Sequence, residues 1–316
     1  MFKLLIGYDG SDCADDALND LHRAGFPDDN VEALLLAVAD VWPDAPGPDY
    51  ARVYPKQAEQ AQRLADAMLA DARLAVTDAA KPVARAFPGW SVRGEAVGDS
   101  PYWGLVMKAQ QWQADLLVVG SHGRGAIGRL VLGSVSQNAV LYADCSVRIG
   151  RCRADAKHEH DAEHDAEQAA PPTRPVRILI GWDGSPDAER AVRAVARRSW
   201  PRDSECRLVT AVDARLETLL AAGKSPEADA EDRDALLKRA ATAAEELRNS
   251  GLLVGDPLMD RGDPKDLLVR EADAWRADCV FVGAKGLSRI QRVLLGSVSA
   301  AVAARAKCSV EIVRSR

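Results

Sequence analysis

The sequence lacks any long apolar segment. Its N-terminus, MFKLLIGYDG, offers one lysine and a short apolar run that ends at Asp9. A membrane-spanning helix needs roughly 20 apolar residues, and a secretory signal needs a longer apolar core than this one. We therefore expect a soluble, cytoplasmic protein that has no membrane partner.

The sequence also lacks an excess of positive charge. Lys and Arg number 41 against 47 Asp and Glu, which gives a net charge of −6. Nucleic-acid binding depends on lysine and arginine contacts to phosphates, and no general basic field is present to provide them. The composition therefore argues against a nucleic-acid partner.

Paired cysteine motifs are missing as well. The six cysteines form no CxxC and no zinc-ligand spacing, and several lie in apolar, strand-like runs. We expect buried free thiols rather than disulfides or a metal centre. They are Cys13, Cys145, Cys152, Cys206, Cys279 and Cys308.

An internal repeat is present. The chain has 316 residues, 47% of them hydrophobic, which is enough for two domains with separate cores. FKLLIGYDGS at 2–11 reappears as VRILIGWDGS at 176–185, an offset of 174 residues. Ser11 and Ser185 stand where a helix N-cap should, each before small or apolar residues at helical spacing. Both copies are thus predicted to begin with a strand, a turn and a helix.

The rest of each copy alternates strands and helices. Further strands are expected at 32–38, 90–97, 115–120 and 146–149, and at 206–212, 252–260, 278–283 and 309–313. Helices are expected near 56–80, 101–113 and 134–143, and near 229–250, 264–276 and 297–306. This order predicts βαβ units and a parallel sheet covered on both faces. Each half is therefore expected to be a five-stranded, doubly wound α/β domain.

Two segments interrupt the repeat. Residues 42–55 hold four prolines and predict a surface loop, with a lid as the alternative; the second copy has 214–228 in its place. Residues 151–175, rich in charge, alanine and histidine, predict a linker between domains at 1–150 and 176–316. Its His158, His160 and His164 could bind a transition metal, but a solvated tether is the favoured interpretation and no metal site is assigned.

Both copies carry one glycine pattern after the fourth strand, G-x2-G-x9-G-S. It reads GSHGRGAIGRLVLGS at 120–134 and GAKGLSRIQRVLLGS at 283–297. Glycines at the end of a parallel strand let backbone N–H groups approach an anion, and a helix N-terminus favours a phosphate. The first two glycines of each copy are expected to make the turn, and the third, with its serine, to start the last helix. Asp9 and Asp183 end the first strand beside this loop, where a carboxylate suits an adenine amino group.

Together these motifs resemble the universal stress protein family. The resemblance rests on the repeated DGS opening, on GDSP at 98–101 and GDPK at 262–265, and on the two glycine loops followed by CSV at 145–147 and 308–310. It implies strand order 3-2-1-4-5 and, in members that keep the glycine loop, a bound ATP or related adenine nucleotide.

The resemblance also implies which residues surround the nucleotide. Asp9 and Val38 would hold adenine in the first domain, and Asp183 and Val212 in the second. The residues placed around ribose and phosphates are Gly120, Gly123, Gly133, Ser134, Val135 and Ser136 in the first domain and Gly283, Gly286, Gly296, Ser297, Val298 and Ser299 in the second. Arg124, Arg129, Lys285, Arg289 and Arg292 either contact phosphate or are solvated, and His122 is assigned no catalysis.

The favoured function is a nucleotide-binding stress-response regulator, in which ATP acts as a structural or switching ligand. Any Mg²⁺ is expected to rest mainly on the phosphates, because no Asp or Glu lies within either loop. The alternatives are a slow ATPase or nucleotidyl-transfer enzyme, although G-x4-GK[ST], S-G-G-x-D-S and H-x-G-H are all missing, and a scaffold that binds no nucleotide. The domains are expected to pair within the chain as a pseudo-dimer through their last strands, with a homodimer as a further option. The protein partner is not identifiable from the sequence.

Overall fold

The computed structural model describes residues 1–41, 53–123, 132–151, 174–212, 226–285 and 295–315. Contacts divide the chain into two compact units. Unit 1 contains Met1–Leu18 and most of the described chain from Asp28 to Val147. Unit 2 contains the described chain from Arg148 onward and also the segment Asn19–Pro27.

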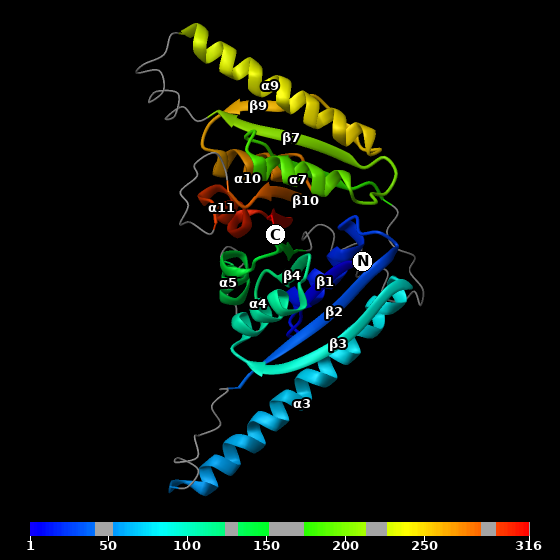
Figure 1. The fold of residues 1–316 in the computed structure, drawn as a ribbon, viewed down its shortest axis with the longest axis vertical. Coiled ribbons are helices and arrows are strands. Elements are labelled where there is room, and N and C mark those ends of the chain that lie inside the picture. The colour runs from blue at the N-terminus through cyan, green and yellow to red at the C-terminus, as the bar shows by residue number, and fades with distance from the viewer. Residues whose placement is uncertain (42–52, 124–131, 152–173, 213–225, 286–294, 316) are drawn as a thin grey trace. The chain divides into compact units, whose positions relative to one another are not determined.

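The first repeat forms an α/β sheet in the order β3-β2-β1-β4-β5. Its strands β1 to β4 are parallel and are labelled in Figure 1. Helix α4 packs against α5, and the long α3 packs along β2 and β3. The elements are β1 (Phe2–Gly7), α1 (Asp12–Asp20), the 3-10 helix η1 (Leu21–Arg23), β2 (Asp29–Asp40), α3 (Pro55–Ala86), β3 (Gly89–Asp99), α4 (Pro101–Trp112), β4 (Leu116–Gly120), α5 (Ser134–Tyr142) and β5 (Ser146–Gly150).

The second repeat has the same topology, in the order β8-β7-β6-β10-β11, with β9 also paired to β7. Helix α7 packs on α9, and α10 packs on α11. The elements are β6 (Arg177–Gly181), α7 (Pro186–Ala196), β7 (Glu205–Val212), α9 (Pro226–Asn249), β8 (Leu253–Val254), β9 (Leu258–Arg261), α10 (Pro264–Ala274), β10 (Cys279–Gly283), α11 (Ser297–Arg305) and β11 (Ser309–Val313). The expected doubly wound fold with order 3-2-1-4-5 is confirmed in both repeats.

The expected caps of the first helices are present. Ser11 Oγ accepts the N–H of Ala14 at 3.2 Å, and Ser185 Oγ accepts that of Ala188 at 3.1 Å. The helix faces predicted by the apolar spacing are buried, with Ala17, Ala191 and Val195 fully inaccessible to solvent. Capping and burial therefore select the same helix start in both copies.

Among the element boundaries that differ from the sequence predictions, three differences involve a proline. The strand expected at 252–260 is divided into β8 and β9, because Pro257 lies between them and has no N–H for the ladder. Helix α3 begins at Pro55, inside the segment expected to be a loop, since proline is tolerated at the first helical position. It also continues through Pro82 to Ala86, and the flanking residues Ala79 and Val83 are buried. Residues 42–52 and the linker histidines lie outside the described residues.

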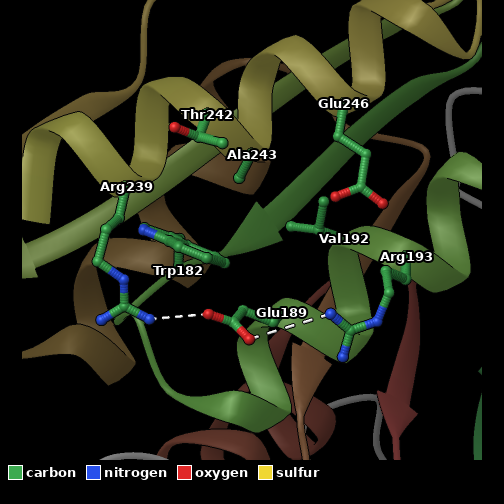
Figure 2. A pocket seen from close by; sticks show the side chains of 8 residues that line it. All are labelled: Trp182, Glu189, Val192, Arg193, Arg239, Thr242, Ala243 and Glu246. Carbon is green, nitrogen blue, oxygen red and sulfur yellow. Dashed lines mark hydrogen bonds and ion pairs between the residues drawn. The ribbon is translucent and has the colours of Figure 1, made fainter.

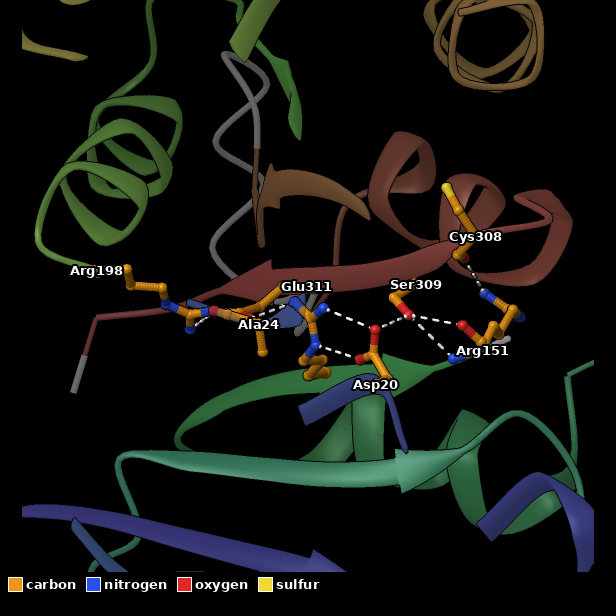
Figure 3. Close-up of polar contacts among 8 residues, drawn as sticks. Asp20, Ala24, Arg151, Arg198, Cys308, Ser309 and Glu311 are labelled. Atoms are coloured by element: carbon orange, nitrogen blue, oxygen red, sulfur yellow. Dashed lines mark hydrogen bonds and ion pairs between the residues drawn. The ribbon is translucent and has the colours of Figure 1, made fainter. Parts of the chain in front are cut away.

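Unit 2 contains a buried ionic cluster (Figure 3). Arg148 donates from Nε to Asp20 Oδ2 at 2.6 Å and from Nη1 to Glu311 Oε2 at 3.3 Å. Arg198 donates to the other oxygen of Glu311 at 2.6 Å, and Ser309 Oγ donates to Asp20 at 2.7 Å. Arg148 is 0% exposed and Glu311 is 1% exposed. Two arginines and two carboxylates thus neutralise one another within the core.

The cluster sets the ionisation of its members. Burial is the largest single influence on Arg148 and by itself would lower its pKa, but Asp20, Cys279 and Glu311 together outweigh burial and raise the pKa above its ordinary value. Burial lowers the pKa of Arg198, and Glu311 opposes this only in part. The neighbouring Cys279 thiol has its pKa raised by burial. Cys145, Cys206, Cys279 and Cys308 are buried free thiols as expected, whereas Cys13 is only half-buried.

We predict that Arg148→Met strongly destabilises unit 2, because it leaves Asp20 and Glu311 buried with one partner fewer. Removing one member of a buried ion pair costs about 3–5 kcal/mol of unfolding free energy. Arg305→Met is the control, since the Arg305–Asp266 pair is exposed and such pairs contribute less than about 1 kcal/mol. Urea unfolding measures both variants. Equal, small losses would contradict a stabilising role for the cluster.

Candidate functional site

The candidate site lies where the central strands of each sheet end. Strands β1 and β4 are parallel neighbours, as are β6 and β10, so their carboxyl ends meet at the same edge. In doubly wound sheets this edge, beside the reversal of strand order, is where ligands bind. Asp9 and Asp183 follow the first strand at this edge, and the glycine loops follow the fourth.

The first loop glycine of each copy touches the first helix. An ideal Cβ built on Gly120 would lie 2.5 Å from the carbonyl oxygen of Cys13, and one on Gly283 would lie 2.6 Å from the carbonyl carbon of Asp187. Neither glycine has a positive φ, so neither makes a left-handed turn. The sequence interpretation of these two as turn glycines is therefore corrected, because they are needed for close approach of strand and helix.

The third loop glycine caps the last helix, as expected. Gly133 and Gly296 are the N-cap residues of α5 and α11, with φ of −62° and −71°, and no side chain caps either helix. Their N–H groups donate to the carbonyls of Ser121 at 2.8 Å and Ala284 at 2.7 Å. The loop and the start of the helix are thus held together, while the first-turn amides keep the positive end of the helix dipole open to an anion.

The two serines after each capping glycine differ in their surroundings. Ser134 and Ser297 are exposed, whereas Ser136 and Ser299 are buried. The buried pair donate their hydroxyls to the carbonyls of Gly120 and Gly283, both at 2.6 Å. Val135 and Val298 lie between them and are half-buried. The exposed serines are therefore the residues that offer a solvent-accessible hydroxyl at the helix start.

The carboxylates of Asp9 and Asp183, which follow the first strand of each repeat, stabilise the turn in which they lie by accepting a backbone hydrogen bond from two residues later. Asp9 Oδ1 accepts the N–H of Ser11 at 3.0 Å, and Asp183 Oδ1 accepts that of Ser185 at 2.9 Å. An ideal Cβ on Gly123 would lie 2.9 Å from Asp9 Oδ2, so a side chain there would press against the carboxylate. The second glycine of the loop thus lets the loop pass close to Asp9.

The valines expected at the base pocket lie near or at the end of the neighbouring strand, since β2 ends at Asp40 and β7 at Val212. Gly7 pairs with Leu36 and Gly181 with Val209, so Val38 and Val212 lie two and three residues further along, level with the acidic turn. Both are half-buried.

His122 Nδ1 lies 3.1 Å from Ser121 Oγ. The predicted site residues that lie outside the described part of the chain are Gly286, Arg124, Arg129, Arg289 and Arg292.

Sequence reasoning missed Asp187. This residue of α7 accepts the N–H of Lys285, within the second glycine loop, at 2.8 Å, and it also pairs with Arg190. The equivalent position of the first repeat, 174 residues earlier, is Cys13, whose sulfur accepts the hydroxyl of Ser121 at 3.6 Å. Comparison of the two copies at that offset would have found the change from thiol to carboxylate.

A polar pocket of about 200 Å³ lies between α7 and α9 in unit 2 (Figure 2). Arg239 bridges its rim, donating to Glu189 at 2.8 Å and to the carbonyl of Gly184 at 2.7 Å. Trp182 forms part of the wall and is 4% exposed, and its Nε1 has no hydrogen-bond partner among the described residues. Through Gly184, α9 is tied to the turn that presents Asp183.

Two kinds of feature are missing from the described residues. No group of three or more His, Cys, Asp or Glu side chains among them is arranged to hold a metal ion. None of the helices in the described ranges is both long and apolar enough to cross a bilayer.

Known proteins resemble this chain along its whole length. The universal stress protein family matches residues 1–151 and 176–314. A universal stress protein of Mycolicibacterium smegmatis is 29% identical over 100% of this chain and 98% of its own length. A universal stress protein of Mycobacterium tuberculosis is 29% identical over 98% of this chain and 96% of its own. The crystal structure of a universal stress protein from Archaeoglobus fulgidus aligns with 99% of this chain and 98% of its own, at 16% identity and a TM-score of 0.58.

We predict that Gly120→Ala and Gly283→Ala each destabilise the protein, because the added methyl meets helix backbone rather than a movable side chain. Overpacking of this kind costs about 1–3 kcal/mol. Gly255→Ala is the control, since nothing lies within 4 Å of its ideal Cβ and its φ is not positive. Thermal melting compares the three variants. If Gly120→Ala matched Gly255→Ala, the close-approach role would be wrong.

Proposed function

Because this chain belongs to the universal stress protein family, we propose that it is an ATP-binding regulatory protein of the stress response, with one adenine-nucleotide site in each repeat. ATP acts as a structural or switching ligand, and the protein works in the cytoplasm. Any Mg²⁺ is carried mainly by the phosphates of the nucleotide. The protein partner that reads the bound state is not assigned.

One observation carries this proposal: the same arrangement is built twice. In each repeat a helix N-terminus that lacks a side-chain cap, and whose N-cap glycine is hydrogen-bonded to the glycine loop, lies at the edge where an acidic turn follows the first strand. Backbone amides and a helix dipole favour phosphate. A carboxylate has lone pairs for several hydrogen bonds, so one that holds its own turn can also accept a hydrogen bond from an adenine amino group.

The proposed contacts follow from these roles. Adenine lies against Asp9 and Val38 in the first site and against Asp183 and Val212 in the second. Ribose and phosphates lie against the glycines of each loop and the first turn of the last helix, namely Gly120, Gly123, Gly133, Ser134, Val135 and Ser136, and Gly283, Gly286, Gly296, Ser297, Val298 and Ser299. Ser136 and Ser299 contribute through backbone, because their hydroxyls are donated to strand carbonyls.

The test is ATP binding by isothermal titration, on protein shown by mass spectrometry to be free of nucleotide. Asp9→Asn with Asp183→Asn keeps the oxygen that holds the turn but presents NH₂ to the base. A hydrogen bond to a charged acceptor contributes about 1.5–3 kcal/mol, so ATP should bind about 10- to 100-fold more weakly. Inorganic triphosphate, which has no base, should bind unchanged.

The matched control is Asp28→Asn with Asp203→Asn, since these exposed residues lie near the start of β2 and β7, at the opposite edge of each sheet. Its ATP affinity should equal that of wild type. Equal losses for ATP and triphosphate in the Asp9 and Asp183 variant would show that these residues do not read the base. A wild-type protein that binds no ATP would overturn the proposed function.

We further propose that the two repeats pair within one chain as a pseudo-dimer, through β5 and β11. An exposed sheet edge presents unpaired backbone N–H and C=O groups, which can pair with other chains and cause aggregation. The edge strand of a second, tandem copy can cover them.

Small-angle X-ray scattering tests the pairing. We expect one compact particle whose distance distribution has a single maximum, at concentrations where the chain is monomeric by light scattering. Two separated maxima would mean independent domains. The mass of one chain is 34.0 kDa. A stable particle of twice that mass would favour the homodimer instead.

A further inference from the structure

The two glycine loops meet different chemical groups on the first helix. In the second repeat the carboxylate of Asp187 accepts the loop N–H of Lys285 at 2.8 Å. In the first repeat the same position holds the uncharged side chain of Cys13, and its sulfur contacts the hydroxyl of Ser121. The backbone beneath is alike, because Gly120 and Gly283 approach the helix equally closely.

The contact places a negative charge beside the proposed phosphate subsite. An ideal Cβ built on Gly296, the N-cap residue of α11, would lie 3.6 Å from Lys285 Cα. Lys285, whose N–H is bound by Asp187, therefore lies beside the start of α11. The Asp187 side chain is 19% exposed, and it is partly balanced by Arg190 on its other oxygen. A loop donor is therefore engaged internally, next to a charge of the same sign as phosphate.

We propose that Asp187 makes the two nucleotide sites unequal, so that the second site binds ATP more weakly than the first and favours adenine nucleotides with fewer phosphate charges. This inference rests on the proposed function. The second site must release the Lys285 amide or bind without it, and in either case the carboxylate repels the phosphates. Like charges in close contact weaken binding by roughly tenfold or more, and the effect grows with ligand charge.

The experiment exchanges the two groups. Asp187→Cys should strengthen ATP binding at the second site about tenfold, and Cys13→Asp should weaken it at the first by a similar factor. Each variant is titrated with ATP and with AMP, in proteins where the other site is blocked by Gly133→Val or Gly296→Val. AMP affinity should change less than about threefold, because AMP carries less charge.

A second variant separates charge from hydrogen bonding. Asp187→Asn retains an oxygen that can accept the Lys285 N–H but removes the charge, so it should recover most of the ATP affinity gained by Asp187→Cys. Titrations with Mg²⁺ and with EDTA complete the set. Weaker MgATP binding by Asp187→Asn, with EDTA abolishing the difference, would make Asp187 a metal ligand and overturn the proposal.

Equal ATP affinities at the two wild-type sites, unchanged by the exchange, would also overturn it while leaving the proposed function intact. Absence of ATP binding at both wild-type sites would instead reject the proposed function, and this inference with it. Circular dichroism confirms that each variant is folded before titration.

Discussion

The close approach of the fourth strand to the first helix is the constraint on which the candidate sites depend. At Gly120 and Gly283 a single methyl group would collide with helix backbone at 2.5–2.6 Å. The hydroxyls of Ser136 and Ser299 then bind the carbonyls of the same glycines and draw the last helix to that point. Three chain segments therefore converge through backbone contacts, which leaves an uncapped helix end facing the strand edge.

Much of this fold could be predicted from the sequence because each sequence pattern that indicates an element occurs in both repeats. Apolar strands, serine caps and glycine spacings recur at fixed offsets, so each assignment in one copy supports the other. The errors lie where local rules have exceptions. Pro257 divides a strand, whereas Pro82 does not end its helix, and the residue that follows it, Val83, is buried. Which outcome a proline produces depends on tertiary packing that a single sequence does not reveal.

The candidate site was predictable in its backbone and less so in its side chains. The cap glycines could be placed because a G-S pair ahead of a helix has a local meaning. The Asp187 contact could not be placed by motif, since it joins residues 98 positions apart, and only the fold brings them together. The ionic cluster around Arg148 is similar, because its partners Asp20 and Glu311 are 128 and 163 residues away.

In a site made chiefly of backbone amides, the ability to bind an anion and the preference for one ligand over another depend on different parts of the chain. The proposed anion subsites depend on helix position and glycine spacing, which both repeats retain. Its preference depends on the side chains around it, and these are free to diverge, as Cys13 and Asp187 have done. Under the proposed function, duplication of the domain gives two sites with the same backbone frame and different electrostatics. The second copy shows the same trend at its acidic turn, where Arg239 holds Gly184 and Glu189, whereas in the first copy Tyr8 donates directly to Asp15. At both of these places the two copies keep the backbone arrangement and differ in where charge is placed.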